Sequence, residues 1–508
     1  MNRDDLMKQD KIAIIEILLA TSAIVDQQSE KIAEQAKIIA EQSTKIADLE
    51  ARLNQNSTNS SQPPSRDLFP KPRSLRKPSG KKAGGQSGHK GKGLKLPQPP
   101  DVIVQHHPVE CVDCDHADEC MEPKQVSDRR YEVDIEIKTI TTEHQRLCVQ
   151  CPRTNEMVTG NFPIGITSTV QYGVNLEALA VCLNTIGMVS LNRTHELLSG
   201  IFGVPLSVGT IATMVKKCAD AVRKTVSDVK DALLREPLIH FDETGIRVDK
   251  ITYWAHIACT ENLKYIFITE KRGKKGMDAA GILPNYVGTG IHDCWGPYFK
   301  YILIRHGLCC AHLLRELIAV LENFHQKWAQ KLIDLLLEMK KTKEELILDG
   351  QYQAPEQVWQ KYSQKYDEIL EEALAQNPLP EKDPNKKGRP KRGKVRALID
   401  RLVLRKEQWL LFFTDFSVPF TNNQAERDFR LVKVKQKVSG GFRTEEGAKD
   451  FAAITSFVGT ARKRGISPFC AVKDALLNQP FSIGCITISG VENFELCHSK
   501  NMVLPTVS

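Results

Sequence analysis

Two aspartates of this 508-residue chain follow short apolar runs that read as strands. Asp242 comes directly after Leu238–Phe241, and Asp293 comes after the run that ends at His292. An acidic side chain at the end of a buried strand is costly to bury unless it binds a positive group, and a divalent metal ion is such a group. Solvated acids at a strand end are the alternative for either residue alone, so the metal hypothesis requires further carboxylates to converge on Asp242.

A third carboxylate, Glu426, begins a charged helix face. The segment 421–430 (TNNQAERDFR) is predicted to open a helix with Thr421 or Asn422 as its N-cap, and this helix should end at Gly440. Glu426 is followed at helical spacing by three basic residues that project from the same face, Arg430, Lys433 and Lys437. The face would seat phosphate groups beside metal ions; a solvated face of ion pairs is the alternative.

An aspartate on each of two strands and a glutamate on a late helix form the sequence signature of a ribonuclease-H-like catalytic core. Three carboxylates such as Asp242, Asp293 and Glu426 can hold two divalent ions roughly 4 Å apart. One ion then activates a water or a 3′-hydroxyl, and the other stabilises the leaving oxygen at phosphorus. Mg²⁺ or Mn²⁺ is the expected cofactor, and metal-dependent cleavage or transfer of nucleic-acid strands is the expected chemistry.

Apolar runs predict the elements that must hold these acids. The β-rich part begins at Pro237, and Leu238–Phe241 is expected to turn through Gly245 into a second strand. Further segments are predicted as strands at 246–259, 263–269, 290–293 and 306–310, with a helix near Met277. Residues 313–374 are nearly all helix-forming. Together with the segments that precede it, this core predicts a multidomain α+β protein.

Two segments concentrate positive charge. Residues 54–100 carry ten Lys or Arg against one acid and are rich in Pro, Gly and Ser, so we expect a disordered or extended basic linker that contacts phosphates. A plain solvated linker is the alternative. The loop 378–396 is also basic and is expected to grip nucleic acid, with Arg389, Lys391 and Arg392 as candidate DNA contacts.

The N-terminal segment 1–55 carries a seven-residue repeat of large apolar side chains. The repeat comprises Leu18, Val25, Ile32, Ile39, Ile46 and Leu53. Such a stripe predicts a coiled-coil helix that pairs with another helix, and hence a homo-oligomer. The second position of the stripe is weak, being Ser29, Ala36 and Ser43, so a lone amphipathic helix packing on its own protein is the alternative.

Two Cys-x-x-Cys pairs predict a zinc-binding module at 101–160. The pairs are Cys111 with Cys114 and Cys148 with Cys151, and each tight turn can present two thiolates to one Zn²⁺. Cys120, His106, His107 and His116 are possible substitutes for one ligand. Residues 131–137 alternate as a half-buried strand would. Four unrelated thiols are the alternative.

Residues 165–232 have a helical pattern interrupted by glycines. Helices are predicted at about 174–188 and 192–201, with a third beginning after the N-cap Ser207. Three short helices are compatible with a helix-turn-helix that binds DNA and equally with a small structural bundle.

Composition limits the class of protein. The formal net charge is +8, and the 14 cysteines in so long a chain do not form the pattern of a disulfide scaffold, which favours a reducing compartment. No run reaches the roughly 18 apolar residues that a membrane span needs. We expect a soluble, cytoplasmic protein.

Three motifs carry a resemblance to a known family. Residues 242–248 (DETGIRV), 292–298 (HDCWGPY) and 422–430 (NNQAERDFR) resemble the acid-bearing motifs of the insertion-sequence-sixty-six family of bacterial transposases, whose DDE enzyme is of the TnpC type. The resemblance extends to the N-terminal helix, the cysteine pairs, residues 84–91 (GGQSGHKG) and residues 461–469 (ARKRGISPF).

The resemblance implies roles for several residues. Asp242, Asp293 and Glu426 would form the metal-binding triad, and the long span between the last two would hold a helical insertion at about 313–405. Cys309 and His312 resemble a Cys/Asp-x-x-His signature and would shape the insertion or the strand ends. Small accessory proteins encoded by the same element are possible partners.

The expected function is that of a DNA transposase. It would bind the inverted-repeat ends of its element, expose 3′-hydroxyls by hydrolysis and join them to double-stranded target DNA. A non-catalytic DNA-binding regulator derived from such an enzyme and a structure-specific nuclease on the same core are the two alternatives.

Because adjacent strand residues point to opposite faces, Glu243 should turn away from the metals that Asp242 binds.

Overall fold

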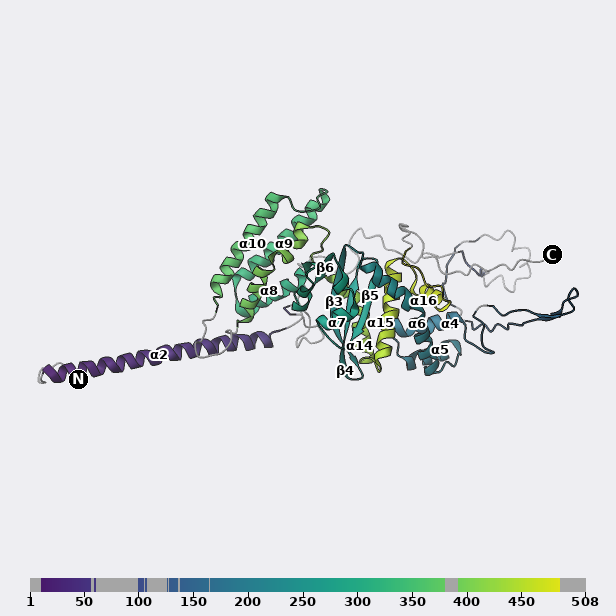
Figure 1. Cartoon of the computed structure of the whole chain (residues 1–508), viewed down its shortest axis with the longest axis horizontal. Coiled ribbons are helices and arrows are strands. Elements are labelled where there is room, and N and C mark those ends of the chain that lie inside the picture. Colours follow the sequence, from purple (N-terminus) through teal and green to yellow (C-terminus); the bar gives the residue numbers. More distant parts are fainter. Residues whose placement is uncertain are drawn as a thin grey trace, which may run out of the picture. The chain divides into compact units, whose positions relative to one another are not determined.

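The computed structural model describes residues 11–55, 59–60, 99–104, 106, 126, 128–135, 138–163, 165–379 and 392–484. The chain divides into two units, of which one comprises 1–73, 163–196 and 206–508 and the other 74–162 and 197–205. The first unit contains a central sheet, the helices that cover it and the long helix α2 (Figure 1). No helix in these described ranges is both long enough and apolar enough to cross a membrane.

The predicted N-terminal helix is confirmed as α2, which runs from Lys11 to Leu53. The apolar side chains of its seven-residue repeat are exposed to solvent, with Leu18 at 64% and Ile32 at 66%. Exposed apolar side chains in a regular stripe are unusual on a surface that has no partner.

The central sheet has five strands in the order β5-β4-β3-β6-β7. The strands are β3 (Leu238–Val248), β4 (Ile251–Cys259), β5 (Lys264–Thr269), β6 (Thr289–His292) and β7 (Arg305–Leu308). Strand β4 is antiparallel to both β3 and β5, whereas β6 is parallel to both β3 and β7. The protein is therefore a mixed α/β structure, as expected for a multidomain α+β chain.

Strand β3 corrects one expectation from the sequence. It neither ends at Asp242 nor turns at Gly245, which pairs with Trp254 in a continuous antiparallel ladder. The chain reverses at Asp249 and Lys250 instead, both of which have positive φ. The reason is that β4 pairs with β3 along its whole length, so the backbone stays extended beyond the point where the parallel neighbour β6 stops.

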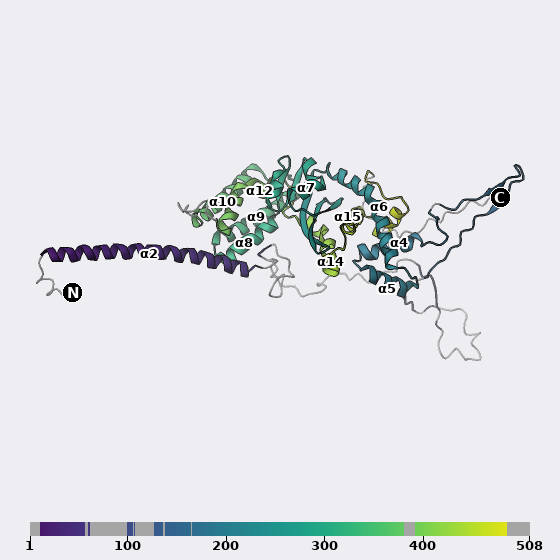
Figure 2. The ribbon, with the colours of Figure 1, turned by 60° about the horizontal axis from the view of Figure 1, so that its bottom comes forward.

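Side chains alternate between the two faces of the sheet. Ile246 and Ile257 pack on helices α13 (Asn423–Asp428), α14 (Arg430–Ser439) and α15 (Glu445–Lys463). The opposite face, with Phe241 and Ala258, lies against α7 (Lys274–Ala280) and the short helix η3 (Leu283–Asn285). Figure 2 shows α7 and α14 on opposite sides of the strands.

Between β7 and α13 the described residues, which leave out 380–391, form five helices. They are α8 (Cys310–Phe324), α9 (Lys327–Leu348), α10 (Glu356–Gln376), α11 (Lys394–Leu404) and α12 (Lys406–Thr414). Large buried side chains such as Trp328, Tyr366 and Trp409 form their shared core, which continues to Leu308 of β7. This core holds the helices to one edge of the sheet.

Between α2 and the sheet, the described residues form three further helices. They are α4 (Val174–Thr185), α5 (Leu191–Phe202) and α6 (Val208–Leu233), and Ser207 caps α6 by accepting a hydrogen bond from the backbone N–H of Thr210. Helix α4 packs on α6 and on α16 (Pro468–Leu476), and α6 packs on α15. Helices α4 and α6 before the sheet and α15 and α16 after it therefore form one helical layer beside β5.

Helix α15 protects the outer edge of strand β5. The side-chain oxygens of Ser456 and Thr460 accept hydrogen bonds from the backbone N–H groups of Ile266 and Lys264, at 2.8 and 3.1 Å. An unprotected strand edge exposes unpaired backbone groups that can pair with other chains. The two hydroxyls therefore replace a sixth strand.

We predict that Ser456→Ala destabilises the fold by about 1–3 kcal/mol, because the N–H group of Ile266 would stay buried without an acceptor. The midpoint of urea unfolding measures this loss. The control is Ser439→Ala, which removes an exposed hydroxyl at the end of α14 and should change stability by less than about 0.5 kcal/mol. Equal midpoints for the two variants would contradict the role assigned to Ser456.

Candidate active site

The parallel register of β3 and β6 brings Asp242 and Asp293 to the same level of the sheet. His240 pairs with Ile291, and each aspartate lies two residues beyond that pair. Neighbouring strands are about 4.8 Å apart, so the two carboxylates lie side by side where the parallel ladder ends. The prediction that Asp242 lies close to Asp293 agrees with this register.

Both aspartates are partly buried, and their environment disfavours negative charge. Burial raises the pKa of Asp242 to about 8, and the nearby charges of Glu243 and Asp293 add to this effect. Burial likewise raises the pKa of Asp293 to about 6, with a further contribution from Glu243. A bound cation would lower both pKa values, because its positive charge favours the ionised carboxylates.

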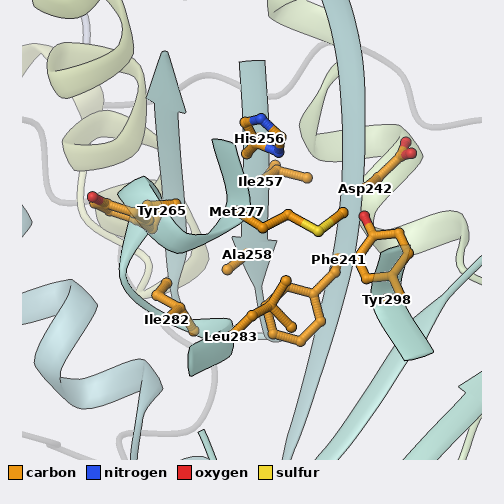
Figure 3. Close-up of a pocket in the computed structure, with 11 residues that line it drawn as sticks. Phe241, Asp242, His256, Ile257, Ala258, Tyr265, Met277, Ile282, Leu283 and Tyr298 are labelled. Atoms are coloured by element: carbon orange, nitrogen blue, oxygen red, sulfur yellow. The ribbon is translucent and has the colours of Figure 1, made fainter. Parts of the chain in front are cut away.

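Glu243 lies on the opposite face of the sheet from Asp242, as strand alternation predicts. Its side chain is only 2% exposed and accepts hydrogen bonds from the hydroxyl of Tyr298, at 2.7 Å, and from Arg272, at 2.9 Å. Figure 3 shows the carboxyl group of Asp242 pointing away from the apolar side chains of Met277 and Leu283 that line the α7 face. The two adjacent acids therefore have separate surroundings.

Asn422 fastens the helix that carries Glu426 to strand β3. Its side chain donates a hydrogen bond to the carbonyl of Phe241 and accepts one from Nδ1 of His240, both at 2.8 Å. Its backbone N–H donates to Sγ of Cys309 at the start of α8. Asn422 occupies the N-cap position of α13, but its side chain bonds the strand and leaves the helix N-terminus uncapped.

Glu426 lies one helical turn after Asn422, on the Asp242 face of the sheet. Nε2 of His312 and Nη2 of Arg315, both on α8, lie 3.9 Å from its Oε1 atom, beyond hydrogen-bond distance. Nδ1 of His312 is buried and has no hydrogen-bond partner in the described part of the chain. The sequence analysis did not identify Arg315 as a site residue. Arg315 comes close to Glu426 only because α8 and α13, which are far apart in the sequence, lie beside each other in the fold.

These residues fit a divalent cation in part. Asp242 and Asp293 supply neighbouring oxygen ligands of raised pKa, which is the donor set that Mg²⁺ or Mn²⁺ prefers. Within the described ranges, however, no three His, Cys, Asp or Glu side chains are close enough together to hold a metal ion. The structure therefore brings the two aspartates together and leaves Glu426 on the same face without closing a three-carboxylate cluster.

The helix of Glu426 is divided at Phe429, which separates α13 from α14, so the predicted single helix is wrong in this detail. Phe429 is fully buried under the sheet and closes the first helix before the second begins. The helix ends at Gly440 in a left-handed conformation, as predicted. Asp428, at the end of α13, forms an ion pair of 2.6 Å with Lys463 of α15, which fixes the helix from its other end.

The predicted DNA contacts have different positions. Arg430, Lys433 and Lys437 are exposed on α14, and the charge of Lys433 lowers the pKa of Asp242 against the effect of burial. Arg392 forms an ion pair of 2.7 Å with Asp400. Arg389 and Lys391 lie outside the described residues, as does most of the basic linker 56–100.

The predicted zinc ligands are described only in part. Cys148 begins β1 (Cys148–Gln150), which pairs with β2 (Met157–Thr159), and Cys151 follows in the connecting turn. Hydrogen bonds from the side chain and backbone of Thr154 lower the pKa of Cys151, which favours the thiolate that zinc binds. Cys111 and Cys114 lie outside the described residues, together with Cys120, His107 and His116.

The strand predicted at 131–137 is wrong for its described part. Residues 131–135 have no β-pairing, and their apolar side chains are exposed, with Ile135 at 80%. An alternating pattern forms a strand only where a neighbouring strand accepts its hydrogen bonds.

Fold and site together define a mixed α/β protein in which two acids meet at the end of a parallel ladder, beside a basic helix. Comparison with family models matches residues 169–450, more than half of the chain, to the IS66 family of transposases. The chain belongs to this family, which indicates a DNA-processing enzyme. Residues 13–95 match a family of unknown function. No curated protein matches the chain.

We predict that Asp242→Asn stabilises the metal-free protein at pH 8 and has little effect at pH 4. The raised pKa of Asp242 means that ionising it costs folding free energy as pH rises from its ordinary value of 3.8 through about 8. Asparagine removes that cost. Thermal unfolding in a chelator should show a rise in Tm of roughly 2–4 °C for each kcal/mol recovered.

The matched control is Asp278→Asn. Hydrogen bonds from Lys274 and Tyr301 outweigh burial and lower the pKa of Asp278, so its contribution to stability is present above its ordinary pKa and is lost as pH falls. This variant should therefore be destabilised at pH 8. A pH-independent effect of Asp242→Asn would refute the electrostatic account.

Proposed function

We propose that this protein is a DDE transposase, which cuts DNA at the inverted-repeat ends of its element and joins the 3′ ends to target DNA. Asp242, Asp293 and Glu426 are the metal-binding residues in this proposal. Membership of the IS66 family supports the transposase role, and the register that sets Asp242 beside Asp293 is the observation that carries the assignment of the acids.

The sheet order supports a ribonuclease-H-like core. In the order β5-β4-β3-β6-β7, strand β4 is antiparallel to both of its neighbours. Strand β6 is parallel to the central strand β3, and β7 is parallel to β6. Asp242 then lies on the central strand, Asp293 directly follows its parallel neighbour, and a helix from late in the sequence brings Glu426 to the same face. This arrangement suits residues that must share metal ions although Asp242 and Glu426 are far apart in the sequence.

Bound Mg²⁺ or Mn²⁺ would supply an activated water or 3′-hydroxyl and charge stabilisation at the leaving oxygen. The chain's own residues would do the rest. Asp242 and Asp293 would orient the ions, and Glu426, free of direct hydrogen bonds to His312 and Arg315, could turn toward them. Lys433, with Arg430 and Lys437, would hold the phosphates of the DNA backbone beside the carboxylates.

We also propose that α2 joins copies of the chain. The exposed apolar repeat from Leu18 to Leu53 supports a coiled coil, which would allow two DNA ends to be held by one assembly. Double-stranded DNA is the substrate, and accessory proteins of the same element are further possible partners. Arg389, Lys391, Arg392 and the helices α4–α6 are proposed as additional DNA contacts.

A structural zinc ion held by Cys111, Cys114, Cys148 and Cys151 completes the proposal. The doubled spacing and the lowered pKa of Cys151 support it. Protein purified without chelator should contain about one zinc per chain, measured by elemental analysis, and Cys148→Ser should lose it. Retention of a full zinc equivalent by that variant would exclude this ligand set.

The central test is strand transfer. Full-length protein, Mg²⁺ and a labelled duplex carrying the inverted repeat that borders this gene should give nicked ends and joined products in a plasmid target. We expect the rate to fall on the order of 100-fold or more in each of three variants, Asp242→Asn, Asp293→Asn and Glu426→Gln. Each variant removes a proposed carboxylate ligand of the metal ions that would stabilise charge at the reacting phosphate.

The control is Glu407→Gln, an exposed acid on α12, which should react as the native protein does. Cutting without joining would favour the nuclease alternative, and activity that survives Asp293→Asn would refute the metal assignment. DNA binding with no cleavage by the native protein would favour the regulator.

A further inference from the structure

Arg272 contacts both strand β4 and the loop that follows Asp293. Arg272, between β5 and α7, lies between two indole rings, with its Cζ atom 4.5 Å from the ring centre of Trp254 and 4.1 Å from that of Trp295. Trp254 belongs to β4, whereas Trp295 belongs to the loop 293–298. A planar guanidinium stacks on aromatic faces on both of its sides, and each such contact is favourable.

The same guanidinium balances a buried charge. Nη2 of Arg272 donates to Oε1 of Glu243 at 2.9 Å, and the Glu243 side chain is 2% exposed. The second carboxylate oxygen accepts the hydrogen bond of Tyr298, which lies in η4 (Gly296–Lys300) at the end of the same loop. A paired cation lowers the cost of burying a carboxylate charge, so Arg272 stabilises the ionised Glu243.

These contacts reach the carboxylate of Asp293 through the backbone of Trp295. The N–H group of Trp295 donates to Oδ1 of Asp293 at 3.1 Å. On the other side, the ring of His292 stacks on Tyr298 at 4.3 Å between centroids. Gly273, next to Arg272, has a φ of +78°, a backbone conformation that favours glycine, and a Cβ at this position would lie 3.6 Å from the Trp295 ring. The loop is therefore fixed at Trp295 and at Tyr298.

We propose that Arg272 is a positioning residue for Asp293: stacked between Trp254 and Trp295 and paired with Glu243, it fixes the direction in which Asp293 presents its carboxylate to a metal ion. The inference rests on the proposed function, because it takes Asp293 as a metal ligand. In this role Arg272 would act through the loop and would not itself be a ligand of the metal. This role also explains why Glu243, the acid next to Asp242, is buried on the opposite face. Glu243 pairs with Arg272, and Arg272 stacks on the loop that carries Asp293.

The test measures metal binding rather than turnover. Chelator-stripped full-length protein is titrated with Mn²⁺, and the rise in Tm gives the concentration at half-saturation. Arg272→Lys keeps a positive charge for Glu243 but lacks the planar group that two indoles can sandwich. We expect its half-saturation concentration to rise about 10–100-fold, the usual effect of losing a partner that orients a metal ligand.

Arg272→Ala alone leaves Glu243 buried and unpaired, so the double variant Arg272→Ala/Glu243→Gln is measured beside it. The double variant should show the same 10–100-fold rise. The matched control is Lys274→Ala, which removes a neighbouring cation that lies 5.3 Å from the Tyr301 ring and pairs with Asp278. It should bind Mn²⁺ as the native protein does, although its Tm falls.

The outcomes separate this inference from the proposed function. If the native protein responds to Mn²⁺, Asp293→Asn does not, and Arg272→Lys and the double variant match the native protein, then Arg272 has no positioning role and this inference fails alone. If the native protein and Asp293→Asn respond identically, the metal assignment fails and this inference fails with it.

Discussion

The hydrogen bonds of Asn422 are the interaction on which the rest of the site depends. One buried amide joins β3 at His240 and Phe241, and the adjoining backbone N–H reaches Cys309 at the start of α8. Three segments that are far apart in the sequence meet there, at the end of the parallel ladder. Because a buried amide without partners is strongly unfavourable, the native packing is the arrangement that satisfies it. These hydrogen bonds fix the position of the helix that carries Glu426 along the sheet.

Around that anchor, the strand separates two kinds of acid. Asp242 faces the helices of the basic stripe, where burial raises its pKa to about 8 against the opposing effects of Lys433 and of a hydrogen bond from the backbone N–H of Glu243. Glu243 faces α7, where Arg272 and Tyr298 satisfy both of its oxygens. A bound cation would therefore stabilise the ionised Asp242, whereas Glu243 already forms an ion pair with Arg272. In the proposed assignment, a metal ligand and the acid that supports the second aspartate's loop are therefore consecutive residues of one strand.

The sequence predicted much of this arrangement from local patterns. The α2 helix, the capping of α6 by Ser207 and the end of α14 at Gly440 depend on residues within a few positions of one another. Strand β3 was predicted too short, because its continuation depends on pairing with β4 and not on its own composition. The strand predicted near Ile135 failed for the converse reason, since no neighbouring strand pairs with it in the described part of the chain.

By itself the sequence determined which residues can do chemistry: three acids at strand ends and on a basic helix, paired cysteines and a resemblance that the family match confirms. Only the tertiary structure decided which of them meet. The parallel register sets Asp242 beside Asp293, α8 brings Arg315 toward Glu426, and two tryptophans from different segments enclose Arg272. Long-range packing fixes such contacts, and no local periodicity encodes them, because the partners are separated by tens to more than a hundred residues of intervening chain.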